Sequence, residues 1–169
     1  MSDTKDGFAP ADRWVLGNLR LSTVAVTKPF RVPCMVPSAY GSVLYRPYRK
    51  VRQCCWYHSV DWQEATAVAA DVVPRALARR AACTGTPPGL QVVVDELLPR
   101  GFPLRLRQAV ESLAWGQPIL ASAQAITHGT HRLTAMRHQG VKSTPALLFA
   151  RAGQRLAEIP GAYPHQLLD

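Results

Sequence analysis

The fold is decided by the stretch PILASAQAITHGTHRLTAMRHQGVKSTPALLF at residues 118–149. Glycine and proline separate its short apolar runs, which favours a strand, a tight turn at Gly129, a helix and a second strand. The helix is expected over THRLTAMRHQ, because Gly140 follows at the position where helices commonly end. The strand after it is predicted by STPALLFA, and two short strands before the turn are predicted by QPILAS and QAIT.

The turn and the helix start form a candidate anion site. A helix N-terminus after a glycine turn presents unpaired backbone N–H groups and the positive end of the helix dipole, which together bind phosphate. Arg132 can add a bidentate guanidinium contact, Thr130 a hydroxyl and His131 a ring N–H. The same pattern also fits an ordinary amphipathic helix with Leu133 and Met136 in the core.

Further elements are expected on the N-terminal side of this stretch. A strand is predicted over residues 92–98, within the segment LQVVVDELL at residues 90–98. The following segment, PLRLRQAVESLAW, has apolar residues at Leu106, Val110 and Leu113, which is a helical stripe that Gly116 ends.

A longer helix is predicted by DWQEATAVAADVVPRALARRAA at residues 61–82. Asp61 is a plausible N-cap, and Glu64 stands at capping-box spacing from it. Pro74 is expected to kink or split this helix. The next segment, CTGTPPG at residues 83–89, predicts a linker because proline and glycine exclude regular structure there.

The positive charge is concentrated in one part of the chain. Twenty basic and 11 acidic side chains give a net charge of +9. Residues 13–60 contain no Asp or Glu, and their basic residues are Arg13, Arg20, Lys28, Arg31, Arg46, Arg49, Lys50 and Arg52. Such a segment attracts polyanions, so DNA is the expected partner, whereas the alternative is a solvated basic face.

Aromatic residues are interleaved with these cations between residues 40 and 57. Cations neutralise phosphates while aromatic rings stack on exposed bases, which is the pattern of single-strand binders. The predicted nucleic-acid-binding residues are Arg46, Tyr48, Arg49, Lys50 and Arg52. The alternative for the aromatic rings is ordinary packing within strands.

Cysteine and histidine spacing does not predict a metal site. Cys34, Cys54, Cys55 and Cys83 include no C-x-x-C pair, and buried thiols are expected. The neighbouring histidines His128, His131 and His138 fall on different sides of the Gly129 turn, so they are expected to point in different directions.

Length and composition indicate one domain with an extension. The chain has 169 residues and is 47% apolar. We expect a flexible tail at residues 1–12, a basic β-rich extension with one helix at 13–88, an α+β domain at 89–150, and a strand or tail at 151–169. No apolar run is long enough to span a membrane, and the N-terminus lacks the layout of a secretory signal, so the protein is expected to be cytoplasmic.

Several short motifs occur in a characteristic order within residues 89–150. They are Leu98-Pro99, Gly116-Gln117-Pro118-Ile119, Gly129, His131, Arg132, Ala135, Gly140 and Pro145. They resemble the ParB/sulfiredoxin-like superfamily, in which a small mixed sheet is packed with helices. The family's acidic residue before the turn glycine is His128 here, and the sulfiredoxin cysteine is replaced by Thr130.

This resemblance implies a nucleotide-phosphate site with ATP or CTP, and Mg²⁺ is compatible with it. By position, the phosphates would be contacted by Gly129, Thr130, His131 and Arg132, with Gln117 and Arg105 lining the same pocket. If the domain is catalytic, Glu111 and His131 are the candidate catalytic residues.

Three functions remain open from the sequence. The first is a DNA-associated protein with a nucleotide-binding domain, either a nuclease or an NTP-dependent DNA-binding factor. The second is a nucleotide-dependent small-molecule kinase, whose basic segment serves an anionic substrate. The third is a non-catalytic regulatory or interaction module. Whether a reaction is catalysed is left open, and an oligomer is compatible with each function.

Overall fold

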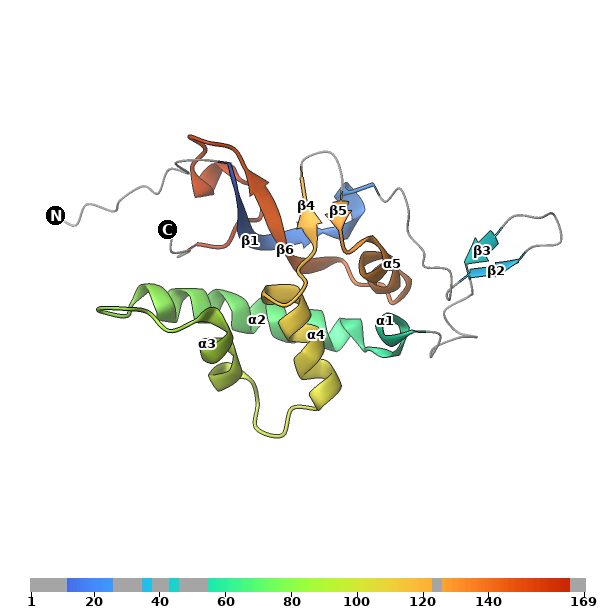
Figure 1. Ribbon diagram of the computed structural model, residues 1–169, viewed down its shortest axis with the longest axis horizontal. Helices are drawn as coiled ribbons and strands as arrows, with labels where there is room; N and C mark the ends of the chain where they lie inside the picture. Colours follow the sequence, from blue (N-terminus) through green and yellow to red (C-terminus); the bar gives the residue numbers. More distant parts are fainter. Residues whose placement is uncertain (1–11, 26–34, 38–42, 46–54, 123–125, 165–169) are drawn as a thin grey trace.

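The computed structural model describes residues 12–25, 35–37, 43–45, 55–122 and 126–164. Helices pack against a four-stranded mixed sheet, which confirms the predicted α+β class (Figure 1). Within the described residues, no helix combines the length and the apolar character needed to cross a bilayer.

The main sheet has the strand order β1-β6-β4-β5. Strand β1 (Arg13–Arg20) pairs antiparallel with β6 (Ser143–Ala150) along its whole length. Strand β4 (Leu120–Ala121) runs parallel to β6, and β5 (Ile126–His128) runs antiparallel to β4. A separate two-stranded sheet is formed by β2 (Met35–Pro37) and β3 (Val43–Tyr45). Strands in residues 118–150 therefore form where the sequence predicts them.

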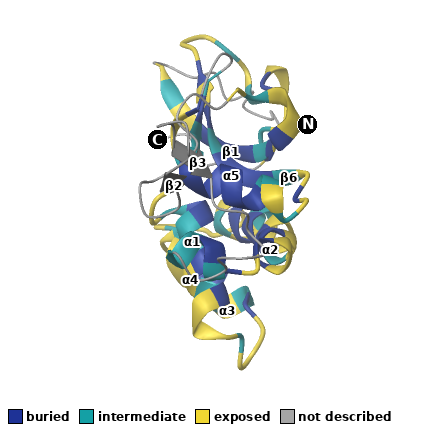
Figure 2. Cartoon of the chain, turned by 90° about the vertical axis from the view of Figure 1, so that its right-hand side faces the viewer, coloured by how far each residue is buried: buried dark blue, intermediate teal, exposed yellow. Residues whose placement is uncertain are grey.

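The helices lie before, between and after these strands. They are η1 (Leu21–Thr23), α1 (Trp56–Ser59), α2 (Trp62–Ala81), α3 (Leu90–Leu97), α4 (Leu104–Ala114), α5 (Thr130–His138) and η4 (Leu156–Glu158). Figure 2 shows α5 dark blue beside β1 and β6, whereas α3 has yellow, exposed residues at the edge of the molecule.

Helix α2 begins as its capping residues predict. The Asp61 carboxylate accepts a hydrogen bond from the Glu64 backbone N–H at 3.0 Å. Pro74 lies inside the helix without splitting it, because Val73 and Ala76 on either side are fully buried in the core. Of the two expected effects of Pro74, a kink or a split, the split is wrong because α2 is continuous from Trp62 to Ala81.

The strand expected at residues 92–98 is also wrong, because residues 90–97 form helix α3. Val93 and Val94 are buried, whereas Val92 is exposed, so one side of the helix packs against the core. Helix α3 contacts α2. β-Branched residues favour strands mainly by packing well on a sheet, and here the valines pack on a helix instead.

One hydrophobic core joins the segments on both sides of the predicted linker. Residues 83–89 contain no helix or strand, as expected. Buried residues of β1 and α2, before the linker, belong to the same cluster as those of α4, α5 and β6, after it. The core therefore crosses the boundary expected at residues 88 and 89.

Gly17 provides a test of the β1–β6 packing. A Cβ at this position would overlap Leu148 Cδ1 and would lie 2.6 Å from the Gly161 carbonyl oxygen. We expect Gly17→Ala to lower the free energy of unfolding by about 2 kcal/mol, because overpacking a dense core forces its neighbours apart. Urea unfolding measures the change.

Gly116→Ala is the matched control. Its nearest neighbour for an added Cβ is the Glu111 carbonyl oxygen at 3.5 Å, an ordinary van der Waals contact. We expect this variant to change stability by less than about 0.5 kcal/mol. Equal unfolding midpoints for the two variants would contradict the close packing of β1 described here.

Candidate functional site

Cys55, His58 and His131 come together where α1 meets α5. Cys55 is the N-cap residue of α1, His58 lies within α1, and His131 lies in the first turn of α5. Cys55 Sγ is 3.1 Å from His58 Nδ1 and 3.4 Å from His131 Nε2. One donor atom from each residue lies within 4.8 Å of the other two. We call these three residues the Cys-His-His cluster.

The two histidines of the cluster are buried, and one of them packs against an aromatic ring. His58 and His131 are 1% and 5% exposed, and their ring centroids are 5.0 Å apart with the rings nearly perpendicular. The Tyr57 ring packs edge-on against His131, with the centroids 5.6 Å apart. Cys55 is half-buried. The thiol therefore lies at the border between solvent and the buried imidazoles.

Burial changes the charge state of the cluster. Desolvation by burial, together with smaller contributions from the neighbouring His131 and His138, lowers the pKa of His58 to about 4. The His58 imidazole is therefore neutral at neutral pH. A neutral imidazole keeps a nitrogen lone pair, which it can offer to a proton or a metal ion.

Two chemistries are open to such a group. A thiol beside an imidazole can transfer its proton and become a nucleophilic thiolate. Alternatively, one sulfur and two nitrogen donors can bind a borderline-soft transition metal, for which thiolate and imidazole are preferred ligands.

Arg132, expected to bind phosphate, points into the protein. It is 2% exposed, and one guanidinium nitrogen donates to the Ser112 carbonyl oxygen at 2.7 Å and to the Ser112 hydroxyl at 2.9 Å. The other donates to the Gln117 carbonyl oxygen. The guanidinium carbon lies 6.0 Å from the Tyr57 ring centroid. Arg132 thus joins the start of α5 to the end of α4 and the loop after it.

The turn at Gly129 is confirmed. Gly129 has a left-handed backbone with φ of 87°, and an added Cβ would lie 2.8 Å from Ile119 Cγ1. Thr130 begins α5 and is half-buried. Gln117 is exposed, and its backbone carbonyl oxygen accepts a hydrogen bond from the Arg132 guanidinium.

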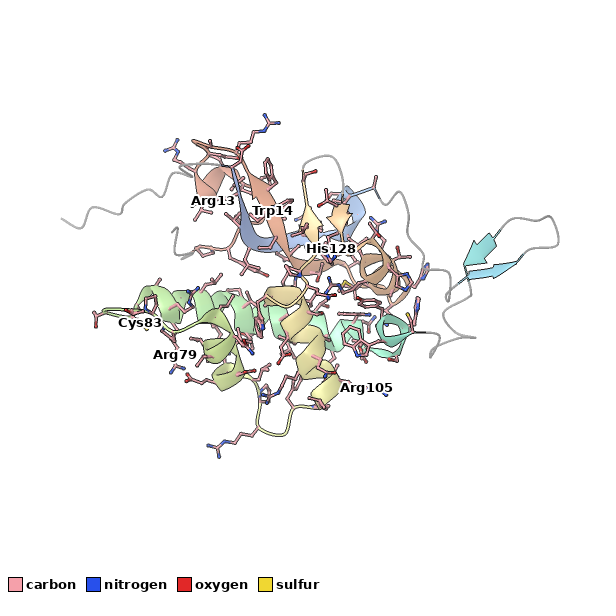
Figure 3. The ribbon with its side chains drawn as sticks, in the orientation of Figure 1. Arg13, Trp14, Arg79, Cys83, Arg105 and His128 are labelled. Carbon is pink, nitrogen blue, oxygen red and sulfur yellow. The ribbon has the colours of Figure 1, made fainter. Side chains whose placement is uncertain are left out.

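The other predicted residues lie apart from this turn or outside the described chain. Arg105 is exposed at the start of α4, at the opposite end of that helix from His128 (Figure 3). Glu111 is half-buried on α4, and its carbonyl oxygen accepts from the N–H groups of Trp115 and Gly116. The predicted nucleic-acid-binding residues Arg46, Tyr48, Arg49, Lys50 and Arg52 lie outside the described residues, as do Cys34 and Cys54.

The expectation of buried thiols is wrong for Cys83. This residue is exposed just after α2, and its thiol donates to the Arg79 carbonyl oxygen at 3.3 Å. Cys83 lies in a loop because it begins a Pro- and Gly-rich segment, which cannot continue helix α2.

The sequence reasoning missed Cys55 and His58 as partners of His131. The histidines near His131 in the sequence, His128 and His138, are both exposed and do not belong to the cluster. The available signal was the three-residue spacing of Cys55 and His58, which places two donors on one face of a helical turn. The contact of Cys55 with His131, 76 residues away, depends on the packing of α1 against α5.

The inward course of Arg132 leads to a stability test. Arg132→Ala should lower the free energy of unfolding by about 3 kcal/mol, because it removes a buried side chain and leaves the carbonyl oxygens of Ser112 and Gln117 without this donor. Arg105→Ala, which removes an exposed guanidinium, should change it by less than about 0.5 kcal/mol. Both are measured by urea unfolding.

The opposite result would restore the sequence-based role of Arg132. If Arg132→Ala unfolds at the wild-type urea concentration while losing affinity for a nucleotide, the guanidinium serves a ligand and not the fold.

Comparison with known proteins gives no family for this chain. No family model, no curated protein and no solved structure matches it. The likeness of residues 89–150 to the ParB/sulfiredoxin-like superfamily stays a prediction from the motifs quoted above. The site is therefore interpreted from its own geometry.

Proposed function

We propose that this chain is a cytoplasmic, DNA-associated protein that binds the phosphate backbone through its basic N-terminal half. One observation carries the proposal: residues 13–60 contain eight basic and no acidic side chains. Neutralisation of phosphates by Lys and Arg releases bound counterions, which supplies most of the affinity in sequence-independent DNA binding.

Basic side chains of the described residues also gather around a pocket beside the end of β1. This pocket has a volume of ≈ 390 Å³ and is lined by Arg20, Arg137 and Lys142 together with Ser22 and Ser143. Arg20 belongs to residues 13–60. Arg137 lies in the last turn of α5, and Lys142 follows that helix. The pocket supports the proposal because it places Arg20, from residues 13–60, beside two cations from the C-terminal part of the chain.

The cations of this pocket have different roles. The Arg137 guanidinium donates from Nε to the Leu21 carbonyl oxygen at 3.1 Å and from another nitrogen to the Val24 carbonyl oxygen. It therefore holds the chain that follows β1 against α5. Arg20 and Lys142 are exposed, and in the proposal these two side chains contact phosphates.

In the same proposal, ATP or CTP binds at the N-terminus of α5. The left-handed turn at Gly129 supports this part, because a helix that begins directly after such a turn offers backbone N–H groups and the positive end of its dipole to an anion. The contacts of Arg132 with Ser112 and Gln117 give it the task of holding this turn in place.

A salt titration tests DNA binding at the pocket. The double variant Arg20→Ala/Lys142→Ala should bind duplex DNA more weakly, and the slope of log affinity against log salt should fall by about 2, because each lost phosphate contact removes about one released ion. Fluorescence anisotropy with a labelled duplex measures both quantities.

The matched control removes two charges from another face of the protein. Arg75 pairs with Asp71 on the surface of α2, and Arg100 is exposed between α3 and α4. Arg75→Ala/Arg100→Ala should leave the slope unchanged. Equal salt slopes for both double variants would contradict phosphate contacts at the pocket. If the wild-type chain does not bind DNA even at low salt, the proposal as a whole is contradicted.

A thermal-shift panel tests the nucleotide part separately. ATP or CTP, with or without Mg²⁺, should raise the unfolding midpoint of the wild-type chain, because a ligand that binds only the folded state stabilises it by mass action. If no nucleotide raises the midpoint at millimolar concentration, the nucleotide part of the proposal fails while DNA binding stands on its own titration.

A further inference from the structure

The Cys-His-His cluster brings three metal-ligand atoms together from distant parts of the sequence. The distances from Cys55 Sγ to the two histidine nitrogens are 3.1 and 3.4 Å. A tetrahedral zinc ion bound at usual lengths separates its sulfur and nitrogen ligands by about 3.5 Å. The two sulfur-to-nitrogen distances in the cluster are therefore close to those of a tetrahedral zinc site.

The kinds of donor select the class of metal. A thiolate and two imidazoles suit Zn²⁺ and related transition metals, whereas Mg²⁺ and Ca²⁺ prefer carboxylate and carbonyl oxygen. The cluster contains no carboxylate. Both of its histidines are buried, and a histidine binds a metal through a neutral imidazole.

Burial around the cluster also fits a bound ion. The Tyr57 and His58 rings both pack edge-on against the His131 ring. Metal affinity depends on ligands whose orientation is fixed by their surroundings, because fewer side-chain rotations are then lost on binding. Two of the three ligands are thus already held in position by the core.

A second histidine at the same sulfur distinguishes a metal site from a thiol–imidazole pair. A nucleophilic thiol needs one imidazole as its base. Here both rings direct a nitrogen at Cys55 Sγ, from two different helices. Convergence of this kind is what a shared ligand sphere requires.

The geometry points to a zinc site formed by Cys55, His58 and His131, which binds one ion per chain and ties α1 to α5. The inference goes beyond DNA binding and does not depend on it. Zinc joins the C-terminal end of the basic segment, residues 13–60, to the helix that follows the Gly129 turn. When zinc binds, the Cys55 thiol releases a proton to solvent and the thiolate becomes the sulfur ligand.

Metal titration of the full chain tests this site. The chain is first stripped with a chelator and then titrated with Co²⁺, which gives a sulfur-to-cobalt charge-transfer absorption only when a thiolate binds it. We expect this band to saturate at one Co²⁺ per chain and to be displaced by Zn²⁺. Zinc at 100 times its dissociation constant should also raise the unfolding midpoint by about 5 to 10 °C.

Matched variants identify the ligands. Cys55→Ser should abolish the charge-transfer band and weaken zinc binding about a hundredfold or more. Cys83→Ser and His128→Ala alter an exposed cysteine and an exposed histidine outside the cluster, and they should leave the band and the midpoint shift at wild-type values. Circular dichroism of the stripped proteins checks that each variant is folded.

Alkylation of the wild-type chain gives a readout that needs no variant. Zinc should protect Cys55 from iodoacetamide, as located by mass spectrometry, while Cys83 stays reactive with and without the ion. The inference is overturned if stripped protein gives no charge-transfer band, if the band survives in Cys55→Ser, or if zinc leaves the alkylation of Cys55 unchanged. Rapid alkylation of Cys55 with no metal binding would instead identify a thiol–imidazole pair.

Discussion

The pairing of β1 with β6 is the constraint on which the rest of the structure depends. The two strands join residues 13–20 to residues 143–150, so they connect parts of the chain that are more than 120 residues apart. Closing so long a loop costs conformational entropy, which burial of the facing side chains must offset. Val15, Leu16, Ala146 and Leu148 are buried in the cluster that also includes the inner side of α2. The helices between the two strands are held against the sheet that this pairing creates.

A second constraint is the buried guanidinium of Arg132. Removing a charged group from water is costly unless every hydrogen bond that it loses is replaced. Ser112 and Gln117 supply two carbonyl oxygens and a hydroxyl as acceptors for two of the guanidinium nitrogens. These bonds fix α5 at its N-terminal end, and α5 in turn fixes His131 beside Cys55 and His58. The buried position of the Arg132 guanidinium thus helps to fix where His131, the residue before it, meets Cys55 and His58.

Local sequence signals predicted most elements of residues 61–150. The Asp61 cap, the Gly129 turn and the apolar stripe of α4 depend on neighbouring residues, and each is found where its pattern indicates. The strand expected in place of α3 shows the limit of such signals, because Val93 and Val94 acquire their conformation from packing on α2.

The candidate site was less accessible to prediction. The inward course of Arg132 and the meeting of Cys55 with His131 arise from contacts between elements far apart in the sequence. The periodicity and spacing of residues carry no information on such contacts, so the arginine was interpreted as a ligand residue. The histidine was compared only with its neighbours along the chain.

The β1–β6 pairing also determines the order of events during synthesis. Strand β1 leaves the ribosome long before β6, so its hydrogen-bonding edge has no partner until nearly all of the described chain has been made. Folds that depend on such non-local pairing form slowly. The nascent chain therefore presents an open strand edge within the strongly basic residues 13–60. Until β6 has been synthesised, this edge must be kept from pairing with other chains, and the basic side chains must be kept from polyanions.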